Sequence, residues 1–122
     1  MRWVWTAVAM AAAAPLAAQS FDVPSGQPIQ LYQELMPGDG LLYLSFLAPE
    51  IAEREMKFDV AAEDLDVLCQ SIGLEKMKES DREIVEIVIR LFSDPIDYGT
   101  SNPDVKQFLN AYDVSNGSCE WY

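Results

Sequence analysis

The stretch that decides the fold is "DVAAEDLDVLCQSIG", residues 59–73. Its apolar side chains recur at spacings of four, three, one and three residues, which places them on one face of a helix. The residues on this face are Ala61, Leu65, Leu68, Cys69 and Ile72. Asp59 suits the N-cap, and Gly73 suits the C′ position just beyond the last turn. The pattern predicts a helix over 59–73 with Cys69 in its buried stripe.

The second of the two cysteines, Cys119, lies in the closing sequence "SNGSCEWY", residues 115–122. A redox pair, a metal site and a structural disulfide are the three hypotheses. No CxxC motif is present, and two thiolates without histidine would need carboxylates to complete a metal site. We favour a disulfide between Cys69 and Cys119, which would close a loop of about 50 residues and contribute on the order of 4 kcal/mol.

The sequence before the helix predicts a hairpin. Residues 29–36, "IQLYQELM", alternate as in a half-exposed edge strand, and "PGDG" at 37–40 is a strong turn signal. Residues 41–48, "LLYLSFLA", are almost wholly apolar, as in a strand buried on both faces. The charged segment 50–58 fits either a bulged strand extension or a short helical turn.

After the helix, residues 74–81 form a polar connector, and "REIVEIVIRLF" at 82–92 has the alternation of a strand. Its apolar face holds Val85, Ile87, Ile89 and Leu91. Residues 103–112 predict a second helix, and a short strand ends the chain. The inward face of that second helix would hold Val105, Phe108, Leu109 and Tyr112. The fold class we predict is a two-layer α+β domain with a mainly antiparallel four-stranded sheet, two helices and one disulfide.

The first twenty residues have the order of a secretory signal peptide: a positive charge at Arg2, an apolar stretch, then small residues. We expect a signal peptide over residues 1–18, cleaved after Ala18, and a single exported domain over 19–122, located in the periplasm or secreted. An uncleaved anchor is the alternative, but an anchor needs about 20 strongly apolar residues. No later segment is that apolar, so we expect no stable membrane insertion after cleavage.

The chain is strongly acidic, with 8 basic residues, 20 acidic residues and a net charge of −12. Loss of a leader containing Arg2 would take the net charge to −13. Nucleic-acid binding needs a basic footprint that neutralises phosphates, so we exclude a nucleic-acid partner.

The residue types present exclude several chemistries. The chain has no histidine, which removes imidazole bases and most catalytic zinc sites, and it has no phosphate-binding loop or other cofactor motif. We therefore predict no cofactor. Paired carboxylates could still serve a hydrolase, and the candidates are Glu50, Glu53 and Glu55, or Asp59, Glu63, Asp64 and Asp66. Oxygen donors in the loop before residue 105 could surround calcium, although turn formation and helix capping explain them better. These donors are Asp94, Asp97, Asn102 and Asp104.

Four features together resemble a family of small exported bacterial proteins of unknown function. They are the leader, "DLDVLC" at 64–69, "EIVIRLF" at 86–92 and "GSCEWY" at 117–122. The resemblance covers most of the mature chain and supports the pairing of the cysteines. Its motifs are structural, so it implies no activity.

The functional hypothesis is non-enzymatic binding of a protein or a cell-envelope component. The edge strand could pair with a partner strand, which makes Leu31 and Tyr32 candidate contacts. In the tail, Tyr122 is a third candidate contact, whereas Trp121 is expected to pack over the disulfide and sheet edge. The alternative hypothesis, from a different class, is a small hydrolase that uses two carboxylates.

Overall fold

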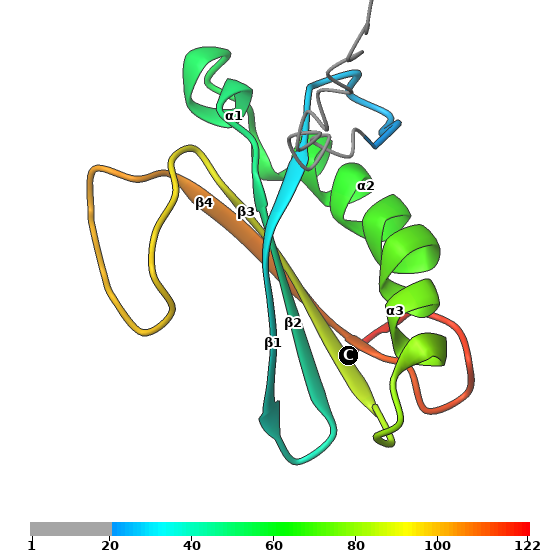
Figure 1. Cartoon of the computed structure of the whole chain (residues 1–122). Coiled ribbons are helices and arrows are strands. Elements are labelled where there is room, and N and C mark those ends of the chain that lie inside the picture. The colour runs from blue at the N-terminus through cyan, green and yellow to red at the C-terminus, as the bar shows by residue number, and fades with distance from the viewer. Residues whose placement is uncertain (1–20) are drawn as a thin grey trace, which may run out of the picture.

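The computed structural model describes residues 21–122. The predicted signal peptide, residues 1–18 with cleavage after Ala18, lies outside the described residues. The strands are β1 (Gln30–Gly38), β2 (Leu41–Leu47), β3 (Glu86–Phe92), β4 (Gln107–Asp113) and β5 (Glu120–Trp121). The helical segments are α1 (Glu50–Glu53), α2 (Phe58–Leu68), the π-helical turn η1 (Cys69–Gly73) and α3 (Leu74–Glu79). The strands form one sheet in the order β1-β2-β3-β4-β5, and α2 and α3 lie along one face of it, so the α+β prediction is confirmed (Figure 1).

The sheet has five strands and is mixed, so the prediction of four mainly antiparallel strands was wrong. Strand β2 pairs with β3 in parallel, whereas the other neighbouring strands pair antiparallel. The cause is the helical segment between β2 and β3, which carries the chain back along the sheet so that β3 starts at the same end as β2. No helix within residues 21–122 is long and apolar enough to cross a bilayer.

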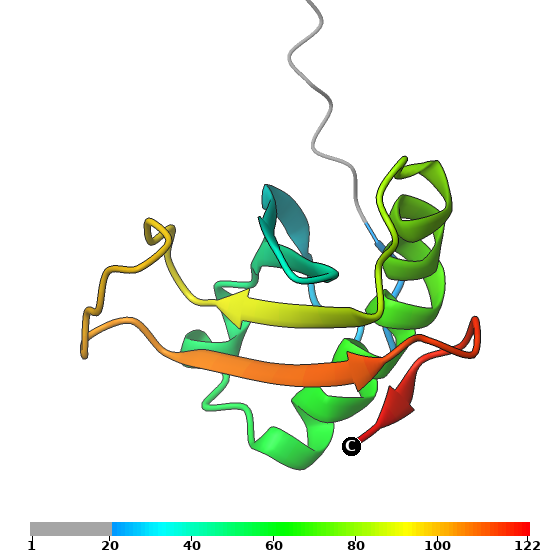
Figure 2. The same cartoon turned by 90° about the horizontal axis from the view of Figure 1, so that it is seen from below.

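The segment predicted as a second helix, residues 103–112, contains most of strand β4 instead. It pairs with β3 over seven successive positions, from Glu86 opposite Asp113 to Phe92 opposite Gln107. Figure 2 shows the two strands side by side and running in opposite directions. Continuous pairing with a central strand outweighs the helical spacing of four apolar residues. The second helical unit of the fold is α1, which corresponds to the helical-turn alternative for residues 50–58.

The predicted hairpin is confirmed. Gly38 pairs with Leu41, which leaves Asp39 and Gly40 as a two-residue turn with φ values of 57° and 75°. Positive φ at both positions is the type I′ geometry that suits the twist of a hairpin. Strand β1 lies at one end of the sheet and β2 lies inside it, as the sequence predicted.

The predicted helix is present but begins and ends elsewhere. Asp59 lies inside the first turn of α2, and helical structure continues past Gly73 into α3. Gly73 is therefore not a C′ residue. A Cβ atom added to it would lie 3.4 Å from the Cδ1 of Ile87, so its small size allows the helix to lie close to β3.

The core lies between the helical segments and the sheet. Every member of the predicted helical stripe is buried, and Cys69 is fully so. Facing them are alternate side chains of the two central strands, each at most 1% exposed. These are Leu42, Leu44 and Phe46 from β2, and Ile87, Ile89 and Leu91 from β3.

Candidate ligand cavity on the open face of the sheet

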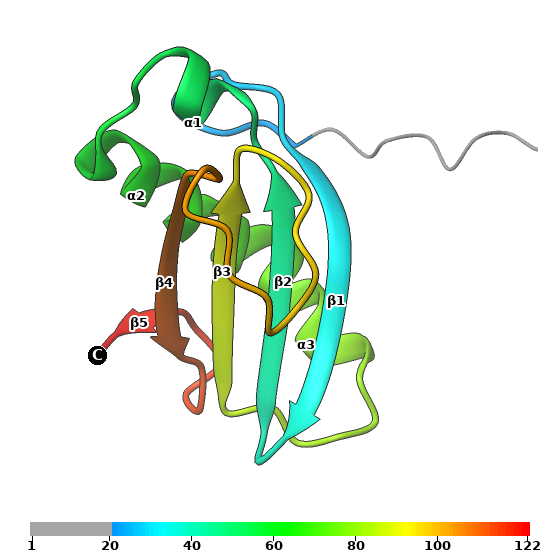
Figure 3. The same cartoon turned by 90° about the vertical axis from the view of Figure 1, so that its left-hand side faces the viewer.

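A long loop, residues 93–106, folds over the face of the sheet that the helices leave uncovered. In Figure 3 the loop passes in front of β2 and β3, and the helices lie behind them. Its base is closed by Ser93, whose backbone N–H donates to the carbonyl of Lys106 at 2.9 Å and whose Oγ accepts from the N–H of Lys106 at 2.9 Å. The sheet and this loop therefore form the two walls of a cavity.

Tyr32, on strand β1, fastens the first part of the loop to the sheet. Its hydroxyl donates to the carbonyl of Ile96 at 3.2 Å and accepts from the N–H of Ile96 at 3.4 Å. Its ring contacts Phe92 edge-on, with centroids 6.2 Å apart. Burial raises the pKa of the Tyr32 hydroxyl, which keeps it protonated as a donor. The role of Tyr32 in the structure is thus to hold the loop above the sheet.

The cavity between the loop and the sheet has a volume of about 540 Å³. This is within the range of roughly 300–1,000 Å³ found for small-molecule sites in proteins. The strands line it with Tyr43, Arg90, Phe92, Gln107 and Leu109, and the loop lines it with residues 96–103 and Val105. The cavity is large enough for a small molecule or the end of a peptide.

Arg90 is the cation of this cavity. Its guanidinium carbon lies 5.4, 5.0 and 5.6 Å from the ring centroids of Tyr43, Phe92 and Tyr98, which are cation–π distances. Its Nε donates to the Oγ of Ser45 at 3.3 Å. Among residues 21–122, no carboxylate oxygen lies within 4.0 Å of the guanidinium. The rings and Ser45 fix the position of a positive charge that no acid of the described chain neutralises directly.

The residues predicted to bind a partner do not form one surface. Leu31 packs against the core, and Tyr32 holds the loop, both from β1. Tyr122 follows β5 at the opposite end of the sheet and is 76% exposed. Its hydroxyl donates to the Oε1 of Glu86 at 2.7 Å, and this bond raises the pKa of the phenol to about 12.

Two of the predicted catalytic acids fasten chain segments to α2. Asp64 is fully buried and accepts hydrogen bonds from the N–H and Oγ of Ser25, at 2.9 and 2.5 Å, and from the Nε2 of Gln27 at 2.7 Å. It thereby anchors the segment that leads into β1. Asp66 accepts from the hydroxyl of Tyr112 at 2.6 Å and from the indole Nε1 of Trp121 at 2.9 Å.

The other predicted acids lie on the surface. Glu50 forms an ion pair with Arg54 at 3.1 Å. Glu55 and Asp59 line an open depression of about 270 Å³ together with Arg54 and Lys57. The remaining two, Glu53 and Glu63, are exposed. The cavity under the loop contains none of these acids.

The oxygen donors considered for calcium form turns in the loop. The Oδ1 of Asn102 accepts from the N–H of Asp104 at 3.0 Å, and the carbonyl of Asp97 accepts from the Oγ1 of Thr100 at 2.7 Å. Asp94 accepts from the hydroxyl of the preceding serine at 3.2 Å. In the part of the chain that the structure describes, no three His, Cys, Asp or Glu side chains are grouped to hold a metal ion.

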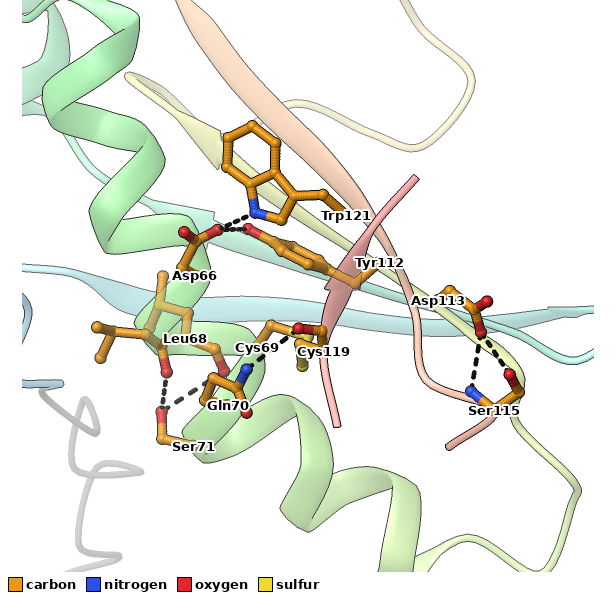
Figure 4. The surroundings of a disulfide bond; sticks show 11 residues. Asp66, Leu68, Cys69, Gln70, Ser71, Tyr112, Asp113, Ser115, Cys119 and Trp121 are labelled. Carbon is orange, nitrogen blue, oxygen red and sulfur yellow. Dashed lines mark hydrogen bonds between the residues drawn. A yellow bond between two sulfur atoms is a disulfide. The ribbon is translucent and has the colours of Figure 1, made fainter. Parts of the chain in front are cut away.

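The disulfide between Cys69 and Cys119 is confirmed, with Cα atoms 6.2 Å apart (Figure 4). The side chain of Gln70 donates to the carbonyl of Cys119 at 3.2 Å. Figure 4 also shows the donors of Tyr112 and Trp121 meeting at Asp66. Trp121 remains 55% exposed, so the indole is held mainly by this hydrogen bond. The tail is joined to the long helical segment covalently and by side-chain hydrogen bonds.

The comparisons with known proteins place the chain in a family. A model described as a family of unknown function (DUF6497) matches residues 5–122. The chain belongs to this family. The resemblance inferred from the sequence, to a family of unknown function, is therefore confirmed. No curated protein and no solved structure matches the chain.

Membership of DUF6497 supplies no activity, so the geometry of the site is the basis for a functional proposal. Arg90, the central residue of the site, was not among the site residues predicted from the sequence. A signal was present: in "IRLF" at 89–92, Arg90 and Phe92 alternate with core residues and share the other face of the strand. The third ring, from Tyr98, is brought to Arg90 by the loop and could not be placed from the pattern of β3 alone.

Proposed function

We propose that this protein is a non-enzymatic binding module that takes part of a partner molecule into the cavity under the 93–106 loop. The observation that carries the proposal is the positioned guanidinium of Arg90 inside a cavity of about 540 Å³. Cavities with aromatic walls and a few polar groups are the usual form of ligand sites. The disulfide supports a location in the periplasm or outside the cell, because disulfides persist in oxidising compartments.

Two features favour this site over the edge of β1. The pairing of β1 with β2 is irregular between Leu31 and Gln33 and again between Leu35 and Gly38. Bulges of this kind protect a sheet edge because they interrupt the row of donors and acceptors that a partner strand would need. The cavity, in contrast, holds a guanidinium between three aromatic rings, and its loop wall is tied to the sheet through Ile96 and at its base.

The same geometry gives the hydrolase hypothesis no specific support. Glycosidase chemistry needs two carboxyl groups on either side of the bond that breaks. Among the described residues that line the cavity, Asp97 is the one carboxylate. Binding without catalysis is the function that this lining favours.

Site-specific photo-crosslinking tests the proposal. A photoreactive phenylalanine analogue would replace Leu109, which lines the cavity and is 48% exposed, in the full chain expressed in its native cells. The matched control is Val60, which is 42% exposed and lies on α2 in the helical layer. We expect a discrete adduct from position 109 that position 60 does not give. Absence of adducts from position 109, or the same adducts from both positions, would refute binding in the cavity.

A further inference from the structure

We propose that the bound molecule presents a carboxylate to Arg90, so that the cavity is a carboxylate-recognition site. This inference rests on the proposed binding function and adds the chemical class of the ligand. A guanidinium carries five N–H donors in a planar fork that matches the two oxygens of a carboxylate. Among residues 21–122, the Nε of Arg90 donates to the Oγ of Ser45 and the two terminal nitrogens have no hydrogen-bond partner, which leaves them for a ligand.

The surroundings of Arg90 prepare it for this role. Three rings lie within 5.6 Å of its guanidinium carbon, and Ser45, which is 1% exposed, holds its Nε. These contacts restrict the long side chain before any ligand arrives, which reduces the entropy lost on binding. They also displace water from the faces of the guanidinium, and an ion pair is stronger where the local dielectric is low.

The charge balance of the cavity favours a monoanion over a dianion. Arg90 is the one basic side chain among the described residues that line it, and Asp97 lines it as well. Because the charges of Arg90 and Asp97 cancel in the lining, a carboxylate adds one unbalanced negative charge and a phosphate dianion adds two. The overall charge of −12 adds to this selection against multiply charged anions.

A carboxylate can come from two sources: the C-terminus of a peptide or a free small organic acid. Both share the same recognition by Arg90, and the volume of about 540 Å³ accommodates either. Nearby hydroxyl and amide side chains, from Thr100, Ser101, Asn102 and Gln107, offer further hydrogen bonds to either ligand. The experiment therefore includes a probe for each source.

The test is titration of the disulfide-bonded protein, followed by NMR at the Arg90 Nε–H and the backbone amides of Gln107 and Leu109. The probes are benzoate, its neutral counterpart benzamide, a tri-alanine peptide with a free C-terminus, the same peptide amidated, and inorganic phosphate. We expect one or both carboxylate probes to bind at millimolar concentrations and the neutral counterparts to bind at least about tenfold more weakly, since hydrogen bonds to charged groups are worth that much. Preference for benzoate would indicate a small acid, and preference for the free peptide would indicate a chain terminus.

Variants separate recognition from general electrostatics. Arg90→Gln should weaken carboxylate binding by about tenfold or more, and Arg90→Lys by less, because it keeps the charge but loses the fork. Lys106→Gln is the matched control, since it also removes one positive charge, but Lys106 does not line the cavity and its Nζ donates to the carbonyl of Met56 at 2.8 Å. Asp97→Asn should tighten binding by removing a negative charge from the lining.

Three results would overturn the inference. The first is an equal loss of carboxylate binding in Arg90→Gln and Lys106→Gln, in variants whose urea melts show that they are folded. The second is tighter binding of benzamide or phosphate than of the carboxylates. The third is the absence of any chemical-shift change with every carboxylate probe. The outcome for the proposed function is separate. If Arg90→Gln leaves the adduct from position 109 unchanged, the carboxylate inference fails and binding in the cavity stands; if position 109 gives no specific adduct, the binding function itself fails.

Discussion

Reduction of the disulfide should remove a large part of the stability of this domain. The bond joins Cys69 to Cys119 across a sequence separation of 50. For a loop of that length the chain-entropy model says that the cross-link lowers the entropy of the unfolded chain by about 14 cal/mol/K. At 25 °C this stabilises the folded state by about 4 kcal/mol, and reduction removes that stabilisation. The total stability of a small domain is about 5–15 kcal/mol, so reduction would leave a marginal protein.

The hydrogen bonds of the tail do not replace the disulfide. Gln70 to Cys119 and Trp121 to Asp66 hold the tail in the folded state, but neither restricts the unfolded chain. The bond from the neutral Gln70 amide contributes about 0.5–1.5 kcal/mol, and the bond from Trp121 to the Asp66 carboxylate contributes about 1.5–3 kcal/mol at most. We therefore expect reduction to lower Tm by about 15–30 °C, at the rate of roughly 4–8 °C per kcal/mol for a domain of this size.

The assay is urea denaturation of the chain without residues 1–18, with and without reductant. Unfolding is followed by two probes. Removal of Trp3 and Trp5 leaves Trp121 as the only tryptophan, so its fluorescence reports the tail. Far-UV circular dichroism reports the whole fold. Gln70→Ala is the control, since it removes a contact to the tail and keeps the disulfide. A loss below about 1 kcal/mol on reduction would refute the entropic reasoning, because that is no more than a single hydrogen bond supplies.

Three further perturbations test separate parts of the structure. Asp64→Ala should lower the unfolding free energy by about 3 kcal/mol, because it leaves the buried amide of Gln27 and the two partly buried donors of Ser25 without their acceptor. The exposed Glu63→Ala should change it by less than about 0.5 kcal/mol in the same urea melts. Gly40→Ala and Gly26→Ala share a φ of 75°, but an added methyl lies 2.8 Å from a β-branched side chain only at Gly40, so its melt should show the larger loss, by about 1 kcal/mol or more; equal losses would contradict the packing argument. Burial and a hydrogen bond to the α2 carboxylate raise the pKa of Tyr112 far above its usual range. The protonated Tyr112 hydroxyl therefore stabilises the fold below the unfolded phenol's pKa of about 10, and this stabilisation is lost as the pH rises above that value. Between about pH 9 and pH 11, the unfolding free energy of Tyr112→Phe should fall less than that of the unmodified chain.

The parts of the fold that could be predicted are those in which one face of an element alternates or repeats cleanly. The helical stripe ending at Cys69 and Ile72 meets this condition, and so do the hairpin and β3. Strand β4 does not, because its inward side places the polar Asn110 between Phe108 and Tyr112. The polar Asn110 interrupts the alternation of apolar and polar residues that marks a strand. The exposed Leu109, together with Phe108 and Tyr112, gives the segment an apolar spacing that matches a helix.

The candidate site was harder to predict than the fold because its parts come from separate elements. Arg90 and Phe92 lie on β3, Tyr43 lies on β2, and Tyr98 lies on the loop. Their meeting depends on the parallel register, in which Tyr43 is paired with Val88 and Ser45 with Arg90. Because the sequence predicted a mainly antiparallel sheet, these neighbours could not be derived from it.

The two faces of the sheet differ in whether their polar side chains already have partners, and this difference supports a ligand on the open face. On the helical side, the two carboxylates that face inward from α2 already have partners: Asp64 holds the segment before β1, and Asp66 holds the tail. Cys69 adds a covalent bond to the same tail. These contacts tie both ends of the described chain to the long helical segment, so the hydrogen-bonding capacity of both carboxylates is used to stabilise the fold. On the open side the strongest polar group, Arg90, has one weak partner in Ser45 and lies in a cavity. Arg90 is partly exposed, so its terminal nitrogens can be reached from the cavity, and a bound carboxylate would use the hydrogen-bonding capacity that Ser45 leaves free.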